Sequence, residues 1–495
     1  MNALLPVLTL SMSLITSLVI FALPEQARRT RIIVNLLGAL AKLVLVGLML
    51  AGVASGASYE ARLALLPGLD LLLRVDALSL LFVTLSAFLW LLTTIYAIAY
   101  LGHGANLSRF FGFFSLCVAA TTGIALAGTL VSFFIFYELL TLSTWPLVVH
   151  KGDAASLAAG RRYLAYTMVG SAVLLAGIVG LEGQVGPVEF IRHGTLVQGD
   201  ANALRWIFLL MIGGLGVKAA LVPLHGWLPH AMVAPAPVSA LLHAVAVVKA
   251  GAFGIVRVVY DVYGVQLVHE LGLGLPLAIA ASVTILWGSL RALQQQDIKR
   301  RLAYSTVSQV SYIVLGTALF GPYATIGGLV HLVHQGLMKI TLFFCAGALA
   351  ERIGVTRVDA LDGAGRRMPL TMLAFSAAAL GMIGVPPVAG FVSKWYLGVG
   401  ALQSGQPWVL LVLALSSILN AAYFLPLLYR AWFLPPPADA PPADAHGHAP
   451  TGSGIGLVAP AVVTGVASVM AGAVAGFGYS PLGWASLIVQ RTYAP

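Results

Sequence analysis

The fold of this chain is decided by one segment, residues 216–251, which reads GVKAALVPLHGWLPHAMVAPAPVSALLHAVAVVKAG. Two lysines, Lys218 and Lys249, lie near its ends in apolar sequence, with prolines between them. A proline inside a membrane helix breaks that helix, and unwound backbone is tolerated there only where it is buried in protein or lines a water-filled cavity. The segment therefore indicates polar chemistry inside a hydrophobic helical bundle.

Composition places the whole chain in the membrane. Hydrophobic residues make up 59% of the sequence, charged residues only 9%, and the mean hydropathy is +0.95. A soluble domain carries roughly a quarter charged residues, so this is an integral membrane protein. The net charge of +10 is spread over short loops, which predicts an orientation signal and not nucleic-acid binding. Cys117 and Cys345 have no Cys or His neighbours at metal spacing, so we expect no disulfide, metal site or cofactor.

Hydrophobic run length predicts an all-α fold with fourteen transmembrane helices. A bilayer core requires about 18–25 apolar residues per helix. Runs of that length start near residues 3, 32, 75, 110, 130, 161, 205, 233, 273, 303, 323, 370, 407 and 455.

The distribution of basic residues predicts the orientation. Sixteen lysines and arginines fall in loops on one side of the predicted membrane and five on the other. Because cytoplasmic loops carry the excess of Lys and Arg, both termini are expected outside, in a bacterial inner membrane. The first apolar run precedes the cluster Arg28, Arg29 and Arg31, the reverse of a cleavable signal peptide, so we expect it to remain as a span.

A second broken segment, GMIGVPPVAGFVSKWYL at residues 381–397, repeats the pattern of the first. Pro386 and Pro387 accompany Lys394 there, as Pro223 accompanies Lys218 five spans earlier. An odd offset inverts the topology, so spans four to eight and nine to thirteen are predicted to form two inverted five-helix repeats, each with a broken helix. A simple structural kink is the alternative for each proline. The expected units are a three-helix segment (1–109), the repeats (110–260 and 273–432), a loop linker (433–454) and a final span with its tail (455–495).

Lysines and arginines are sorted differently. Five of the seven lysines lie in apolar spans, whereas the arginines are expected almost entirely in loops, with Arg257 ambiguous. Lysine can lose its proton when it is desolvated, but arginine remains charged, so this pattern indicates proton movement through the membrane. We expect Lys42, in the peripheral second span, to reach back toward a loop.

Among the acidic residues, only Glu138 is predicted to lie deep in a span. A charge at a helix centre costs about 2.5–3.5 kcal/mol on insertion scales, so Glu138 should face the bundle interior and have a partner. Lys218 is the candidate. Such a pair forms either a proton switch or a static buried ion pair.

Histidines extend the set of ionisable groups. His243 precedes Lys249 by six residues, about 600° of helix turn, so the two side chains point in different directions and need not touch directly; a water molecule could bridge them. It is either a relay member or a histidine that only satisfies a backbone carbonyl. In HLVHQGLMKITLFF (331–344), His331 and Lys339 share a helix face and His334 lies one turn from His331. These groups exchange protons near neutral pH, and no carboxylate accompanies them to suggest a metal site.

Five segments together resemble the antiporter-like subunits of respiratory complex I, Mrp-type cation/proton antiporters and membrane-bound hydrogenases. They are the segment quoted first and residues 137–147, 297–313, 331–344 and 384–397. The resemblance extends from about residue 70 to 432. It implies that Glu138 and Lys218 are the family's paired glutamate and lysine, Lys249 its central lysine, and Lys394 its terminal lysine. His331, His334 and Lys339 lie on the eleventh-span segment.

That last segment departs from the complex I pattern HLxxHAxxK, because Gln335 takes the place of the second histidine. The arrangement looks closer to the D subunit of Mrp antiporters, whereas residues 234–251 read more like complex I. The resemblance implies a proton-translocating subunit of a multisubunit Na⁺/H⁺ antiporter, not an enzyme, working with other membrane subunits, protons, Na⁺ and lipid. The alternatives are a proton-pumping subunit of a complex I-like oxidoreductase or hydrogenase, and a gradient-coupled partner of an inorganic-carbon uptake complex.

Overall fold

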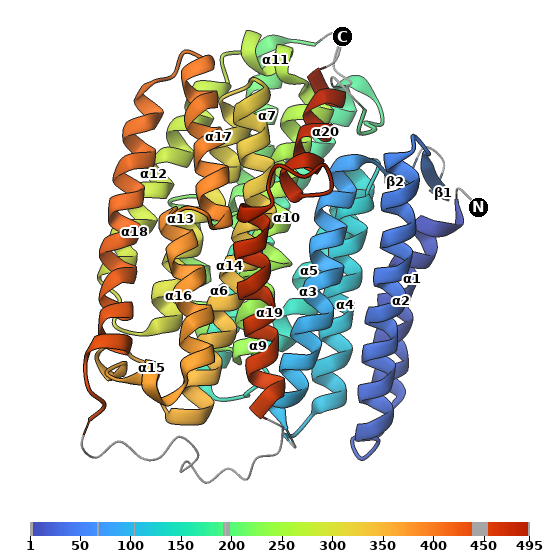
Figure 1. Ribbon diagram of the computed structural model, residues 1–495. Coiled ribbons are helices and arrows are strands. Elements are labelled where there is room, and N and C mark those ends of the chain that lie inside the picture. Colours follow the sequence, from blue (N-terminus) through green and yellow to red (C-terminus); the bar gives the residue numbers. More distant parts are fainter. Residues whose placement is uncertain are drawn as a thin grey trace.

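The computed structural model describes residues 3–66, 69–102, 104–191, 194, 199–437 and 454–493, which form an upright bundle of helices with a two-stranded hairpin at one end (Figure 1). The long helices are α1 (Leu4–Ala22), α2 (Arg28–Ala54), α3 (Ala77–Leu101), α4 (Leu107–Leu126), α5 (Leu130–Val148), α6 (Ala154–Val185), α7 (Ala201–Lys218), α12 (Gly274–Leu293), α13 (Ile298–Ala318), α14 (Pro322–Ile353), α18 (Trp408–Phe433) and α19 (Gly454–Ala473).

Shorter elements fill the connections and the broken segments. They are β1 (Tyr59–Leu66), β2 (Leu69–Val75), η1 (Leu224–Gly226), α8 (Trp227–His230), η2 (Ala231–Val233), α9 (Ala236–Ala244), α10 (Val247–Arg257), the π-helical η3 (Val258–Tyr263), α11 (Val265–Glu270), η4 (Val358–Ala360), α15 (Ala364–Arg367), α16 (Pro369–Ile383), α17 (Ala389–Gln403) and α20 (Pro481–Tyr493).

The all-helical membrane fold is confirmed. Within the described residues, twelve helical segments are long and apolar enough to cross a bilayer, counting 236–263 as one. At the other two expected positions lie α13, whose 21 residues are richer in polar side chains, and the pair α16 and α17, each of 15 residues. Fourteen crossings and the inverted repeats therefore remain predictions. The predicted 433–454 linker lies mostly outside the described residues.

Helix α14 forms the centre of the bundle. It packs against α3, α9, α13, α16, α17 and α19, and its apolar membrane-spanning stretch is fully buried (Figure 1). By contrast, α1 and α2 lie at one edge with much of their surface exposed, including Leu18 and Leu37. A helix that is buried on all sides is where polar side chains can be kept away from lipid.

Three interruptions occur in the helices of the bundle that the structure describes. Helix α7 ends at Lys218, and α16 ends at Ile383 before α17 begins at Ala389. The third, between α9 and α10 at residues 245–246, was not predicted, because residues 236–263 read as one continuous apolar run. The 600° relation between His243 and Lys249 assumed a continuous helix and is therefore wrong.

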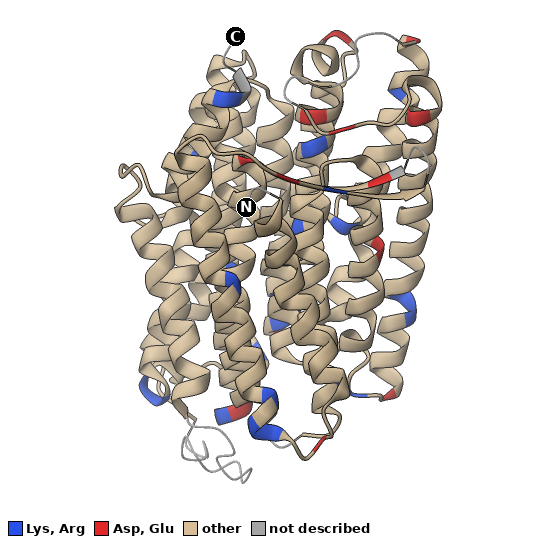
Figure 2. Ribbon diagram, turned by 90° about the vertical axis from the view of Figure 1, so that its right-hand side faces the viewer, with Lys and Arg blue, Asp and Glu red and all other residues tan. Residues whose placement is uncertain are grey.

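Charged residues lie mainly at the two ends of the bundle, with a few blue segments between them (Figure 2). We call the end with β1 and β2 the hairpin end and the opposite end, with α15, the arginine-rich end (Figure 1). The expectation that arginines lie almost entirely in loops is wrong, because most of the described arginines belong to helices; three are also buried, among them Arg257, whose place the sequence left ambiguous. Arg31, Arg257 and Arg301 lie within helices and are only 2%, 2% and 5% exposed. Each guanidinium is retained there because it is hydrogen-bonded, as buried charges require.

Candidate functional site

Glu138 and Lys218 lie near one another but do not form the expected direct ion pair. The Lys218 Nζ donates to the Tyr137 carbonyl at 2.5 Å and lies 3.2 Å from the centre of the Tyr137 ring. The Glu138 carboxylate instead accepts a hydrogen bond from Ser171 of α6. The two charges remain within coulombic range. Separate hydrogen-bond partners therefore hold the two groups in place.

Lys249 connects this region to α14. Its Nζ donates to the Leu332 carbonyl of α14 at 2.7 Å. Two residues further on, a Cβ on Gly251 would come within 2.2 Å of the Ala219 backbone nitrogen. Only glycine permits α10 to approach the end of α7 this closely. The close approach places the backbone that carries Lys249 directly beside the backbone that carries Lys218.

A continuous set of hydrogen bonds joins Lys339 to Lys394. Lys339 Nζ donates to Ser305 Oγ at 2.8 Å, and Tyr423 Oη lies 3.0 Å from that oxygen and 2.6 Å from Asn420 Oδ1. Asn420 Nδ2 then donates to the Met382 carbonyl at 3.0 Å, which also accepts from Lys394 Nζ at 3.2 Å. We call this set the lysine bridge. It crosses α14, α13, α18, α16 and α17.

The break after α16 is what receives Lys394. Gly384 has a φ of 99°, a left-handed conformation that ends the helix and leaves its last carbonyls exposed. Lys394 Nζ donates to the Ile383 carbonyl at 2.7 Å and to Ser417 Oγ at 2.9 Å. Because a helix C-terminus carries partial negative charge, this position stabilises an ammonium group.

His331 and His334 both face α17, at different positions along it. His331 Nδ1 is 2.8 Å from Ser393 Oγ, and its ring centre is 5.1 Å from that of Tyr312. The Tyr312 ring in turn lies 5.5 Å from Lys394 Nζ. His334 faces the start of α17 at Ala389. The geometry therefore brings His331, but not His334, toward Lys394.

Several buried polar side chains of this region have no hydrogen-bond partner among the described protein atoms. They include both ring nitrogens of His243 and the side-chain amides of Gln309 and Gln335. Buried polar groups in native proteins are almost always bonded to protein or to ordered water. These side chains are thus positions at which internal water molecules can bind.

Lys42 does not reach toward a loop, so that expectation is wrong. Its side chain is fully buried, donates to Thr122 of α4 and lies 5.3 Å from the Trp90 ring. The second span presents this face to α3 and α4, and the interior therefore encloses the lysine. Its bonding partners are separate from the lysine bridge.

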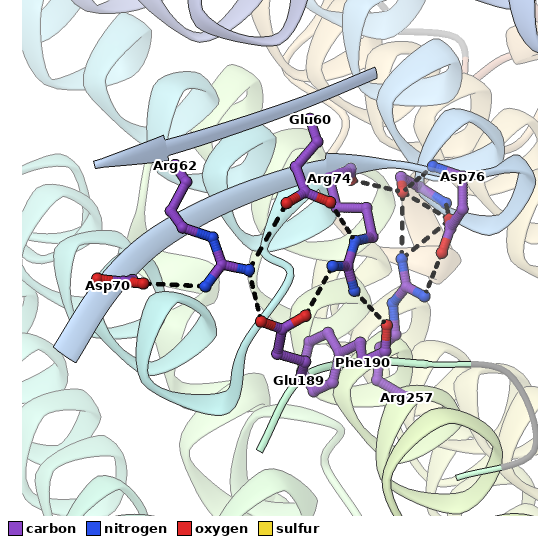
Figure 3. Close-up of polar contacts among 9 residues, drawn as sticks. Glu60, Arg62, Asp70, Arg74, Asp76, Glu189, Phe190 and Arg257 are labelled. Atoms are coloured by element: carbon purple, nitrogen blue, oxygen red, sulfur yellow. Dashed lines mark hydrogen bonds and ion pairs between the residues drawn. The ribbon is translucent and has the colours of Figure 1, made fainter. Parts of the chain in front are cut away.

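An ionic network covers the hairpin end (Figure 3). Glu189, which follows α6, accepts from Arg62 at 2.5 Å and from Arg74 at 2.7 Å. Arg257 Nη1 lies 2.6 Å from both Asp76 and Asp261. The pKa of Glu189 lies below its usual value, because the two arginines outweigh the opposing effect of its partial burial. The network ties the hairpin to α6, α3 and α10.

Asp261 is a further acidic residue within a candidate membrane segment, close to the end of residues 236–263. Asp261 belongs to η3 and its side chain is 15% exposed. Together with Asp76 and Arg257 it lines a cavity of about 330 Å³ that opens at the hairpin end. Tyr260 and Thr325 of α14 also line this cavity, and their hydroxyls are 2.8 Å apart.

Five further residues of this region were not predicted from the sequence: Ser305, Tyr312, Ser393, Asn420 and Tyr423. A signal existed for one of them, since Asn420 is a lone amide in the apolar run of α18. The others are ordinary serines and tyrosines, and nothing local marks them. Within the described residues, no group of three or more His, Cys, Asp or Glu is arranged to hold a metal ion.

Comparison with known proteins gives a consistent result. Residues 127–420 match the family described as NADH:quinone oxidoreductase/Mrp antiporter, transmembrane, and residues 68–111 match the N-terminal family of complex I chain 5. The chain is 37% identical over 377 residues to NADH-quinone oxidoreductase subunit N of Desulforudis audaxviator, covering 74% of each. It is 31% identical to a probable K(+)/H(+) antiporter protein of Rhizobium meliloti, covering 79% of this chain but only 39% of that one.

Similarity in structure extends over nearly the complete chain. A chain in the structure of the Mrp complex from Dietzia sp. superposes with a TM-score of 0.86 and is 27% identical. The superposition covers 99% of this chain and 98% of that one.

Proposed function

The chain belongs to the NADH:quinone oxidoreductase/Mrp antiporter family and is a proton-translocating membrane subunit of the type found in that family. We propose that it is a subunit of a multisubunit Na⁺/H⁺ antiporter. The observation that supports this choice is the 27% identity to a chain of the Mrp complex at a TM-score of 0.86, against 22–24% identity to structural neighbours from redox complexes, which have similar coverage. The other membrane subunits of the antiporter are the expected partners.

We further propose that protons move along a line from Glu138 and Lys218, through Lys249, to Lys339 and Lys394. Lys249 and Lys339 are close enough for their charges to interact, as are Lys249 and His331. In such a line, a proton gained by one amine disfavours the protonated form of the next. Internal water at His243, Gln309 and Gln335 would carry protons between the side chains.

The lysine bridge would couple its two ends without being a complete proton wire. Ser305 and Tyr423 can pass a proton through their hydroxyls, but the Asn420 amide does not release its proton. When Lys394 is deprotonated, it no longer needs the Met382 carbonyl, and the Asn420 amide becomes that carbonyl's main donor. A change in the protonation of Lys394 would thereby alter the hydrogen bonds that lead to Lys339.

The test uses everted membrane vesicles that contain the complete complex. The substitutions are Glu138→Ala, Lys218→Met and Lys394→Met, and the readout is collapse of a pH gradient on addition of Na⁺ or K⁺. Each variant should lower the exchange rate to about a tenth or less with the complex still assembled, since removal of one general acid–base group costs about 10²-fold or more. Near-normal exchange in all three would refute the proposed line.

Lys42→Met is the matched control, because Lys42 is as buried as Lys218 but bonds only Thr122 among the described partners. Its exchange rate should stay within about twofold of wild type. Its melting temperature should be unchanged or raised, because an apolar group of similar volume avoids the cost of burying a charge.

A second function is supported by a different observation. The identity of 37% over 74% of both chains links this protein to an NADH-quinone oxidoreductase subunit. In that case the chain would pump protons for a redox complex and would not respond to Na⁺ or K⁺. Affinity purification of the tagged protein separates the two proposals: small membrane antiporter subunits support the first, and quinone oxidoreductase or hydrogenase subunits support the second.

A further inference from the structure

The cavity at the hairpin end extends into the helical part of the bundle. Its volume is about 330 Å³, and its walls are the end of α2, the start of α3, η3, the first turns of α14, and α20 (Figure 1). Ser58, on one side of the cavity, is exposed, whereas Leu329 is only 2% exposed. Leu329 lies seven residues after Pro322, the first residue of α14, which corresponds to about 10 Å of helix. The cavity therefore reaches below the surface of the hairpin end.

Two aspartates line this cavity and differ in how completely they are hydrogen-bonded. Asp76 caps α3, and its carboxylate accepts from the backbone and the hydroxyl of Ser79 and from both terminal nitrogens of Arg257 (Figure 3). Asp261 accepts one hydrogen bond among the described residues, from Arg257 Nη1 at 2.6 Å. A carboxylate has about four acceptor positions. Asp261 therefore retains positions at which it can accept from water or take up a proton, whereas Asp76 is occupied in holding the fold.

Other polar groups of the cavity favour internal water. The hydroxyls of Tyr260 and Thr325 are 2.8 Å apart, and both residues line the cavity. Arg257 Nε has no hydrogen-bond partner among the described protein atoms, although the residue is only 2% exposed. Buried polar atoms are almost always bonded to protein or to ordered water. Tyr260 and Asp261 also belong to the π-helical η3, and such turns are rare and frequently occur at functional sites.

A stack of side chains separates the cavity from Lys249. Arg257, Phe253 and Lys249 are spaced four residues apart on α10, so they share one face of that helix. The guanidinium carbon of Arg257 lies 5.1 Å from the centre of the Phe253 ring, and the Phe82 ring of α3 lies 5.0 Å from the same centre. Both phenylalanines are fully buried. Two apolar rings thus lie within the roughly 12 Å of α10 that separate the cavity from the lysine.

Helix α14 brings the same two points closer together. The carbonyl of Leu332 accepts from Lys249 Nζ at 2.7 Å. Leu332 follows Leu329, at the deep end of the cavity, by three residues, or about 4.5 Å of helix. Only a short barrier therefore lies between the cavity and the central lysine.

We propose that this cavity is the outer opening of the proton line, where Asp261 exchanges protons with Lys249 across a gate formed by Phe82 and Phe253. Displacement of either ring admits water between Lys249 and the hydroxyls of Tyr260 and Thr325. A proton leaves the ammonium for this water, passes through the hydroxyl pair and protonates the Asp261 carboxylate, which releases it to the solvent. When the rings close, the constriction is dry and blocks the path. The proposal rests on the proton line proposed above but not on which complex the chain serves.

Cysteine accessibility tests whether water reaches the deep end of the cavity. Cells expressing the complete complex with one introduced cysteine are treated as spheroplasts or as everted vesicles with methanethiosulfonate ethylammonium, a small cation that does not cross membranes. Leu329→Cys should react from the same side as Ser58→Cys, and the reaction should abolish proton transport. Val330→Cys, fully buried and not lining the cavity, should react from neither side. The native cysteines are buried.

Substitution of Asp261 tests its role in proton exchange. Asp261→Asn should lower the transport rate by about 10²-fold, because a positioned acid–base group contributes at least that factor. Asp261→Glu keeps the acid and should retain most of the rate. Glu270→Gln, at an exposed carboxylate of α11, is the control and should transport like wild type. The amount of assembled complex is measured for each variant.

Opening the gate gives a readout that a purely structural role of Asp261 does not change. Phe253→Ala should produce a passive proton leak in vesicles without added Na⁺ or K⁺, and the double variant Phe253→Ala, Asp261→Asn should suppress that leak. Phe114→Ala removes an equally buried ring on α4 and should not leak. If Asp261→Asn does not assemble, the Leu329→Cys reaction and the effect of Phe253→Ala decide the outcome.

Three results would overturn the proposal. They are failure of Leu329→Cys to react where Ser58→Cys does, normal transport by Asp261→Asn, and absence of a leak in Phe253→Ala or its persistence in the double variant. Lys218→Met is measured in parallel. If it is inactive while any of these results is found, only the outer opening is refuted; if it also transports normally, the proton line itself has failed.

Discussion

Buried lysines in this protein differ in what surrounds them. Lys218 contacts a carbonyl and an aromatic ring, Lys394 the end of a helix, and Lys339 a serine hydroxyl. All three have neutral or partially negative oxygen partners in place of a carboxylate. An ammonium stabilised only by dipoles gives up its proton more readily than one in an ion pair. Such surroundings would suit groups that exchange protons, as we propose for these lysines.

Tyr423→Phe tests the lysine bridge. The substitution removes the only hydroxyl that links Ser305 to Asn420 in the bridge and keeps the ring. We expect the exchange rate in vesicles to fall about tenfold while the amount of assembled complex is unchanged, since coupling between two sites is typically worth about 5- to 150-fold. Tyr429→Phe is the control, because Tyr429 is on the same helix but is 57% exposed. Equal rates for both variants would show that the bridge is not used.

Glu189→Gln tests the hairpin network. The pKa of Glu189 in the folded protein lies below its usual 4.5, so the carboxylate stabilises the fold at neutral pH and this contribution is lost as pH falls below 4.5. The melting temperature of the variant should therefore be lower than wild type at neutral pH, by the equivalent of at most about 1 kcal/mol per ion pair. The difference should shrink in acid.

The control for this pH dependence is Glu270→Gln, at an exposed carboxylate that is hydrogen-bonded to Gln266. Its melting temperature should follow wild type at every pH. A difference between Glu189→Gln and wild type that stays constant down to acidic pH would show that the ion pairs do not stabilise the fold.

Helices in this bundle are broken where polar groups are needed. The ends of α7 and α16 and the gap between α9 and α10 all lie next to a lysine or histidine of the proposed line. A helix interior has no unpaired carbonyl to offer, whereas a helix end has several. The prolines matter less for bending the chain than for exposing these backbone groups in the protein interior.

Gly251→Ala tests the contact between two of these broken helices. An added Cβ would lie 2.2 Å from the Ala219 nitrogen, and backbone cannot move aside as a side chain can. Overpacking of this kind costs about 1–3 kcal/mol, so the melting temperature should fall and exchange should be impaired. Gly213→Ala, on α7 with no atom within 4 Å of the added Cβ, should be as stable as wild type. A fully active Gly251→Ala protein would contradict the packing.

The complete bundle separates its charges by position. The ion-pair network of Figure 3 covers the hairpin end, many arginines lie at the opposite end, and Lys42, Lys218, Lys249 and Lys339 are buried in the interior. This distribution predicts that the arginine-rich end faces the cytoplasm, because basic residues are retained on that side.

Single-cysteine labelling tests that orientation, and both native cysteines, Cys117 and Cys345, are buried and should give little background. Ala3→Cys should react with a membrane-impermeant maleimide in intact spheroplasts. Gln294→Cys, exposed at the arginine-rich end, should react only in everted vesicles. The opposite labelling pattern would invert the predicted topology.

The fold class, the family and the helix interruptions near residues 218 and 383 could all be predicted from local sequence. Hydropathy, proline positions and short motifs are properties of neighbouring residues, so they can be read without knowing how helices pack. The sequence also pointed to Glu138, Lys218, Lys249, Lys339 and Lys394 as the interior ionisable groups. Their pairing could not be read in this way, as the missing Glu138–Lys218 bond and the buried Lys42 both show.

Packing alone decided which groups meet. Ser305, Asn420 and Tyr423 join Lys339 to Lys394 although they lie up to 118 residues apart in the chain. A hydrogen bond between distant helices depends on their relative rotation and depth, and no short stretch of sequence encodes either. The amino-acid sequence therefore specified which residues can hold a proton within the membrane, and the assembled bundle specified which of them are neighbours.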